Sequence, residues 1–169
     1  MKIRLANLTD IPDIMRVINA VVPGMLAAGN FQWDSSYPNP KVFETDIALN
    51  QLWVAVIDGE IAGVTAITTD QSPEYADVGW DINETAIVTH RLAVHPKFTG
   101  RGIAVALLIQ AEHEAVKHHI SVLRIDTNTK NQATQALFPK LGYVYAGEIG
   151  LAFRPGLRFF CYEKRLSEN

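Results

Sequence analysis

The segment His95–Leu108, HPKFTGRGIAVALL, joins two apolar runs through a turn in which an arginine stands between two glycines. The run before it, Thr85–Val94, is long and apolar enough to be a central strand. The run after it repeats its apolar residues with helical spacing: Ala104, Leu107, Leu108, Ala111 and Ala115. A strand that leads into an amphipathic helix predicts a sheet covered by helices.

The rest of the chain continues this alternation of strands and helices. Thr9 is expected as the N-cap of the first helix, Asn39 and Pro40 should begin the second, and Asp58-Gly59 is typical of a hairpin turn. We expect strands at 2–7, 52–57, 60–69, 85–94, 122–127, 143–149 and 158–166, and helices at 8–22, 40–49, 103–117 and 131–141. The segment 23–38 should be irregular or partly helical. The order βα(α)βββαβαββ predicts an α+β (mixed α/β) fold in a single domain, 1–169.

Composition limits the possible partners. The formal net charge of −3 gives no general reason to bind nucleic acid or an anionic membrane surface. The apolar runs are too short to span a bilayer and no signal peptide is recognisable, so a cytoplasmic location is expected. Cys161 is the only cysteine and is expected to be a small strand residue, without a disulfide or a cysteine metal cluster.

The glycine turn has the features of an anion site. The first backbone N–H groups of a helix lack helical acceptors, and the helix dipole places partial positive charge there. Gly100 and Gly102 would expose these groups to a pyrophosphate, with Lys97 and Arg101 at the rim. Walker and Rossmann motifs do not fit, because Ile103 and Ala104 follow Gly102 and no third glycine comes at Val105. A turn without a ligand remains the alternative.

The run RLAVHPKFTGRGIAVALL resembles the acyl-CoA-binding segment of the GCN5-related N-acetyltransferase (GNAT) superfamily, whose core is Gln/Arg-x-x-Gly-x-Gly/Ala after a strand ending in Leu-Ala-Val. Thr99, Gly102 and Ala104 occupy the core positions, and Thr99 replaces the usual Gln or Arg. The segment 128–149 resembles the second motif of the family, an Asn, a helix, Tyr-x-x-x-Gly-Phe and a strand. The resemblance covers nearly the whole chain, although residues before 50 match only in pattern.

The resemblance implies a mostly antiparallel mixed sheet with two splayed central strands, flanked by helices. Acetyl-CoA would be the cosubstrate, with no metal. Its pantetheine would pair with the backbone around Leu92 and Val94, and its pyrophosphate would meet the N–H groups of the turn. The expected cofactor-binding residues are Leu92, Ala93, Val94, Thr99, Gly100, Arg101, Gly102, Ile103, Ala104, Asn131, Phe138 and Lys140.

Amine acetylation needs a base, and often an acid for the leaving thiolate. His90 is the first candidate for the base, because it matches a histidine position of arylalkylamine N-acetyltransferases and histidine titrates near neutral pH. Glu84, acting through water, is the second. The tyrosine that often serves as the acid in the family is replaced by Phe138, and the unusual Pro139 follows it. The alternatives are that Tyr143 or Tyr145 replaces that acid, or that the thiolate leaves unprotonated. A structural role stays open for each of these side chains.

The acceptor is expected to be an amine of a small molecule or a peptide. Trp33, Tyr37 and Trp80 are the expected acceptor-binding residues, in segments that also carry carboxylates. The sequence HEAVKHH misses the spacing of a zinc motif, because Lys117 stands where the second histidine is needed. Family habit and the apolar strand 158–166 suggest a homodimer. The competing hypothesis, motivated by Phe138 and Pro139, is a non-catalytic module that binds CoA or a partner.

Overall fold

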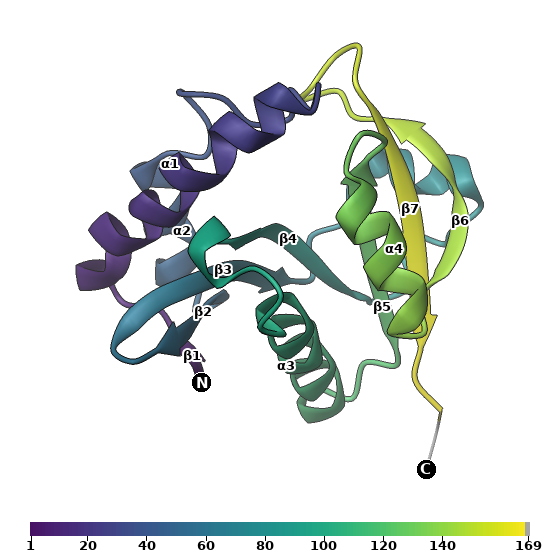
Figure 1. Cartoon of the computed structure of the whole chain (residues 1–169). Coiled ribbons are helices and arrows are strands. Elements are labelled where there is room, and N and C mark those ends of the chain that lie inside the picture. Colours follow the sequence, from purple (N-terminus) through teal and green to yellow (C-terminus); the bar gives the residue numbers. More distant parts are fainter. Residues whose placement is uncertain (168–169) are drawn as a thin grey trace.

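A seven-stranded sheet runs through the computed structural model, which describes residues 1–167 (Figure 1). The strand order is β1-β2-β3-β4-β5-β7-β6, and every neighbouring pair is antiparallel except β4 and β5. The strands are β1 Lys2–Leu5, β2 Leu52–Ile57, β3 Glu60–Thr68, β4 Ile87–Val94, β5 Val122–Asn128, β6 Val144–Gly150 and β7 Arg158–Arg165. The predicted mixed, mostly antiparallel sheet is confirmed.

Four α-helices cover the sheet, and they also follow the predicted order: α1 Ile11–Ala27, α2 Pro40–Ala48, α3 Ile103–Lys117 and α4 Gln132–Lys140. The connections also contain three short 3-10 turns: Leu8–Asp10 before α1, Pro73–Val78 before β4 and Pro96–Phe98 after β4. Leu52 and Val54 of β2 pack with α1 and α2, whereas Ile57 packs with α3. Because side chains alternate along a strand, these helices cover opposite faces of the sheet (Figure 1). None of the helices in residues 1–167 is long and apolar enough to cross a membrane.

The helix boundaries show one wrong prediction. Thr9 is not the first N-cap: Asn7 accepts a hydrogen bond from the Thr9 amide, and Asp10 accepts one from the Asn7 amide. This reciprocal pair is a capping box around the 3-10 turn that precedes α1. The helix then continues through Pro23 to Ala27. The predicted cap Asn39 is confirmed, since its side chain accepts from the Val42 amide.

The central strands diverge, as the family resemblance implies. β4 and β5 are paired only at Ile87 with Leu123 and at Val88 with Arg124. Beyond these pairs the two strands carry no ladder between them, so the sheet opens between its two parallel strands. On its other edge, β4 has a bulge against β3, where Arg91 takes a left-handed backbone with φ +54°.

The carboxy-terminal strand β7 lies inside the sheet, between β5 and β6. It therefore has no free edge with which to pair across a two-fold axis, and the outer strands are β1 and β6. Cys161 lies buried in β7, where burial raises the pKa of its thiol to about 12. A buried thiol with a raised pKa is chemically inert at neutral pH.

Candidate functional site

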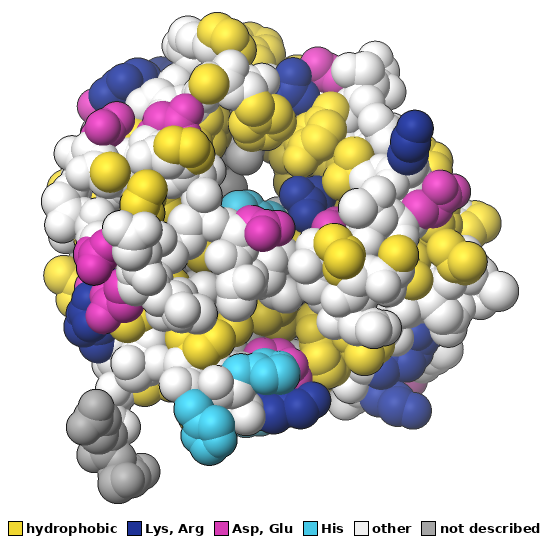
Figure 2. Space-filling view, turned by 180° about the vertical axis from the view of Figure 1, so that it is seen from behind, with side chains coloured by type: hydrophobic (Ala, Val, Ile, Leu, Met, Phe, Trp, Pro, Cys, Tyr) yellow, Lys and Arg dark blue, Asp and Glu magenta, His cyan; other side chains and the backbone are white. Residues whose placement is uncertain are grey.

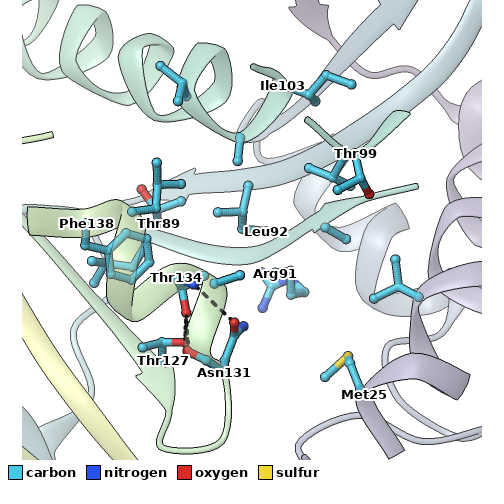
Figure 3. A pocket seen from close by; sticks show the side chains of 18 of the residues that line it. Met25, Thr89, Arg91, Leu92, Thr99, Ile103, Thr127, Asn131, Thr134 and Phe138 are labelled. Carbon is cyan, nitrogen blue, oxygen red and sulfur yellow. Dashed lines mark hydrogen bonds between the residues drawn. The ribbon is translucent and has the colours of Figure 1, made fainter. Parts of the chain in front are cut away.

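The larger cavity of the protein occupies the gap between β4 and β5 and has a volume of about 490 Å³. The start of α3 and the inner face of α4 also line it, as Figure 3 shows for Ile103 and Phe138. The predicted cofactor-binding residues that line it are Leu92, Ala93, Val94, Thr99, Gly100, Gly102, Ile103, Ala104, Asn131 and Phe138. Arg101 and Lys140 are not among its lining residues.

The turn before α3 presents backbone N–H groups to the larger cavity. Gly100 and Gly102 have φ values of +80° and +77°, the left-handed region that favours glycine. The amide of Ala106 donates to the Gly102 carbonyl at 3.0 Å. The amides of the residues between Gly102 and Ala106 come before this bond and have no helical acceptor. An ideal Cβ at either glycine would meet no atom within 4 Å, so the space beside the turn is open.

The cationic side chains near this turn have partners already. Lys97 Nζ lies 3.0 Å from a carboxylate oxygen of Glu60. The Arg101 guanidinium lies 5.5 Å from the centre of the Phe98 ring, at the distance of a cation–π contact. An anion bound at this turn would therefore be held mainly by the backbone and the helix dipole.

The α4 side of the larger cavity is held by hydroxyl and amide groups. Asn131 caps α4, because its Oδ1 accepts from the Thr134 amide at 3.2 Å. The hydroxyls of Thr127 and Thr134 lie 2.6 Å apart and tie β5 to α4 (Figure 3). Phe138 is buried against Tyr143 and Tyr162. At the position where the family often has its acid, the cavity wall is therefore apolar.

A smaller cavity of about 260 Å³ adjoins the larger one. Its lining residues are Gln32, Trp33, Tyr37, Ser72, His90, Arg91, Asp126, Leu151 and Phe153. Five of these, Gln32, Trp33, His90, Arg91 and Asp126, line the larger cavity too. Figure 2 shows a hollow on this face of the molecule, with histidine, basic and acidic side chains at its edge and hydrophobic side chains around it. The two cavities meet at the splay of the sheet.

His90 stands at this junction. Its Nε2 lies 3.0 Å from the Asp70 carbonyl oxygen. Because a carbonyl only accepts hydrogen bonds, Nε2 carries a proton, and in the neutral ring Nδ1 keeps its lone pair. The histidine that the sequence singled out as the base thus has a free nitrogen for proton transfer.

Three other predicted residues lie elsewhere. Glu84 binds Arg124 at 3.1 Å and Arg165 at 2.7 Å, and the bond to Arg165 is the main reason that the pKa of its carboxyl is lowered. Trp80 packs on the Tyr75 ring and under the Arg124 guanidinium. In the part of the chain that the structure describes, Glu84, Trp80 and Tyr143 do not line either cavity. The other two predicted acceptor-binding residues, Trp33 and Tyr37, both line the smaller cavity.

Tyr143 has no hydrogen-bond partner for its buried hydroxyl among residues 1–167, and burial raises its pKa. Tyr145 lies half exposed on β6, where it packs on Phe160 and Tyr162. Both rings therefore serve packing in this structure, and neither is among the residues that line the two cavities.

Asp126 is a site residue that the sequence analysis missed. It lies on β5 and lines both cavities. The Tyr75 hydroxyl donates to its Oδ2 at 2.5 Å. Burial raises the pKa of Asp126, while the Tyr75 hydrogen bond and the nearby His90 act in the opposite direction. The available signal was the single carboxylate in the central strand Val122–Asn128, since charged side chains are rarely buried in a central strand without a function.

Among known protein families, the one described as acetyltransferase (GNAT) family matches residues 25–143, more than half of the chain. The chain belongs to the GNAT family. A GNAT family acetyltransferase from Streptococcus agalactiae has a similar structure, with a TM-score of 0.83 and 29% identity over 99% of this chain and 96% of that one. The acyl-CoA-dependent N-acyltransferase class that the motifs predicted is the class of this family.

Two further known proteins are similar to this GNAT chain, one in structure and one in sequence. The putative acetyltransferase yncA of Salmonella typhimurium was solved with acetyl-CoA. It shares the fold at a TM-score of 0.71 and 19% identity, over the whole of this chain and 95% of that one. Human N-acetylaspartate synthetase is 27% identical over 112 residues, which are 66% of this chain and 33% of that protein. The matched region thus spans about a third of the synthetase.

The GNAT site fits CoA on two observations of its own. The glycine turn leaves open space beside N–H groups without helical acceptors, which suits a pyrophosphate. The part of β4 beyond Val88 has no ladder on its β5 side, which leaves a strand edge along the larger cavity for an extended ligand.

Proposed function

We propose that the protein transfers an acetyl group from acetyl-CoA to a primary amine by direct attack in a ternary complex. The observation that carries this proposal is the junction of two cavities at His90 and Asp126. The larger cavity begins at the helix start to which we assign the pyrophosphate, and the smaller one adjoins it at His90 and Asp126. Donor and acceptor can therefore meet without leaving the protein.

In this proposal the chain's own groups bind, orient and move a proton. The amides of the turn before α3 hold the pyrophosphate, and the free edge of β4 orients the pantetheine arm. Bound acetyl-CoA supplies an activated thioester. His90 Nδ1 accepts a proton from the acceptor ammonium, so that the neutral amine can attack the thioester carbonyl. Asp126 stabilises the positive charge on either partner of this transfer.

Phe138 supplies no proton to the leaving thiolate. The thiolate of CoA is stable enough to leave near neutral pH, so the apolar wall is compatible with catalysis. Phe138 is also the residue that favours the competing function, a module that binds CoA without turnover. Calorimetry with CoA, together with thiol release from acetyl-CoA over a panel of amines, separates the two: binding without acceptor-dependent thiol release would establish the module.

The relatives named N-acetylaspartate synthetase support an amine of small size as the acceptor, since their name describes an N-acetylated small molecule. A homodimer and a cytoplasmic location remain predictions. Because β7 is internal, a dimer would form through a face of the sheet or through the outer strand β6, where Val144 and Tyr145 are exposed.

A further inference from the structure

We propose that the acceptor is a free amino acid, whose carboxylate binds Arg91 while its amine lies at His90 and Asp126. This inference rests on the proposed function, because it assigns the smaller cavity to the acceptor of the acetyl group. It goes further by naming the chemical class of that acceptor and the residue that selects it.

The β4 bulge places Arg91 in the site. In a regular strand, successive side chains point to opposite faces. The register between β3 and β4 shifts at this point, and Arg91 takes φ +54°. His90 and Arg91 both line both cavities. Bulges re-aim side chains next to functional sites, and the bulge at Arg91 lies where the two cavities meet.

Asp46 fixes the orientation of the Arg91 guanidinium. Its carboxylate accepts from Nε at 2.8 Å and from Nη2 at 2.7 Å, a two-point pair reaching from α2. The Asp46 side chain is 4% exposed and that of Arg91 17%. Nη1 is not part of this pair. A guanidinium held on one edge by a buried carboxylate keeps its other amino group pre-organised for a second anion.

The charges around the smaller cavity suit a compact zwitterion. Arg91 supplies the cation, and Asp126 supplies a carboxylate beside His90. Gln32 and Ser72 add uncharged polar groups. A cavity of about 260 Å³ lies at the small end of ligand sites, the size class of a single amino acid.

An arginine closes the apolar wall of this cavity. The Arg154 guanidinium lies 5.1 Å from the Tyr37 ring centre and 5.3 Å from that of Phe153, and both rings line the cavity. Arg154 Nη1 also approaches the Asp34 carboxylate at 3.8 Å. These contacts fasten the segment 151–157 to the segment 34–37, so the wall that would meet the amino acid side chain is built from residues far apart in sequence.

The test uses several amino acids that have uncharged side chains. For each of them, kcat/KM is compared with the values for its carboxamide and for its decarboxylated amine. The carboxamide also imitates the amino terminus of a peptide, and its amine is less basic than that of the acid. Without recognition of the carboxylate, the amide would therefore react at least as fast. We expect kcat/KM for the acid to exceed that for the amide by about 10- to 100-fold, the effect of a hydrogen bond to a charged group.

Arg91→Met should abolish this preference, so that kcat/KM for the acid falls by about 10- to 100-fold to the level of the amide or below. Because that variant leaves Asp46 buried without its partner, the double variant Arg91→Met with Asp46→Asn serves as the second test, with both charges removed. Arg16→Met is the matched control, since Arg16 forms an exposed pair with Asp13 on α1.

If the parent enzyme acetylates the amides or the simple amines with the same kcat/KM as the acids, the inference is wrong and the proposed function still stands. The same holds if a folded Arg91 variant keeps the preference for the acids. If the parent enzyme acetylates none of the acids, amides and amines, the proposed function fails, and the inference fails with it.

Discussion

Replacing Gly102 with valine is the sharpest perturbation of the anion site. Gly102 is the N-cap of α3 with φ +77°, and a Cβ there would meet no protein atom within 4 Å. The valine side chain would therefore not clash with the fold. It would instead occupy the space beside the helix start, where the proposal places the pyrophosphate.

The expected loss of affinity follows from the contacts that valine would block. A hydrogen bond to a charged group contributes about 1.5–3 kcal/mol, so blocking two of them costs about 3–6 kcal/mol. Since 1.4 kcal/mol corresponds to a factor of ten, CoA should bind about 10²- to 10⁴-fold more weakly. The left-handed backbone should also destabilise the fold by about 2 kcal/mol, which lowers Tm by about 4–8 °C in a chain of this size.

Gly59→Val is the matched control. Gly59 lies in the β2–β3 hairpin with φ +78°, also has no atom within 4 Å of an ideal Cβ, and does not line either cavity. It should lose similar stability and no CoA affinity. Calorimetric titration with CoA and thermal unfolding of both variants measure the two effects. A Gly102→Val protein that binds CoA as tightly as Gly59→Val would refute the assignment of the pyrophosphate to this turn.

Three further predictions concern the residues at the junction and the assembly. His90→Gln should lower turnover by about 10²- to 10⁴-fold with acetyl-CoA affinity retained, and should remove the rise of the parental rate with pH; a variant with parental rate and pH profile would exclude His90 as the base. Asp126→Asn should raise the free energy of unfolding at neutral pH in urea titrations. Burial raises the pKa of Asp126, so the stability that its carboxyl contributes is complete below its unfolded pKa of about 4 and is lost as the pH rises through the folded value. The gain in the free energy of unfolding should shrink towards acidic pH. An equal gain at acidic and at neutral pH would contradict burial of the carboxylate as its cause. Sedimentation should show a homodimer at micromolar concentration, and a monomer alone would exclude it.

Local patterns were sufficient to predict the order of the strands and helices, whereas the splayed, mostly antiparallel sheet was expected from the family resemblance. The apolar periods, the Asn39 cap and the Asp58-Gly59 turn act over a few residues, and the structure has each of them. The glycine turn was equally readable, because its chemistry depends on backbone N–H groups at a helix start and not on distant side chains. The sequence placed Ala104 in the core stripe of α3, but it is only partly buried and lines the larger cavity, with Ile103 buried in the stripe instead.

The catalytic surroundings depend on tertiary contacts and could not be predicted in the same way. The β4 bulge at Arg91 contains no glycine that would mark it in the sequence. Asp46, the partner of Arg91, lies on α2, far away in the sequence. Glu84 has the right chemistry for a base, yet Arg124 and Arg165 hold it in an ion-pair network away from the cavities. The surroundings of Asp126 could not be predicted either, because Tyr75 and His90 approach it from other segments.

The most direct test of the proposed function is a mass-spectrometric assay of acceptors after incubation of the purified protein with isotope-labelled acetyl-CoA and a mixture of small amines and amino acids. We expect a labelled N-acetyl product that requires the protein, forms with matching release of CoA thiol, and is lost in the Gly102→Val variant but not in Gly59→Val. Tight binding of acetyl-CoA with no labelled product and no thiol release would contradict it.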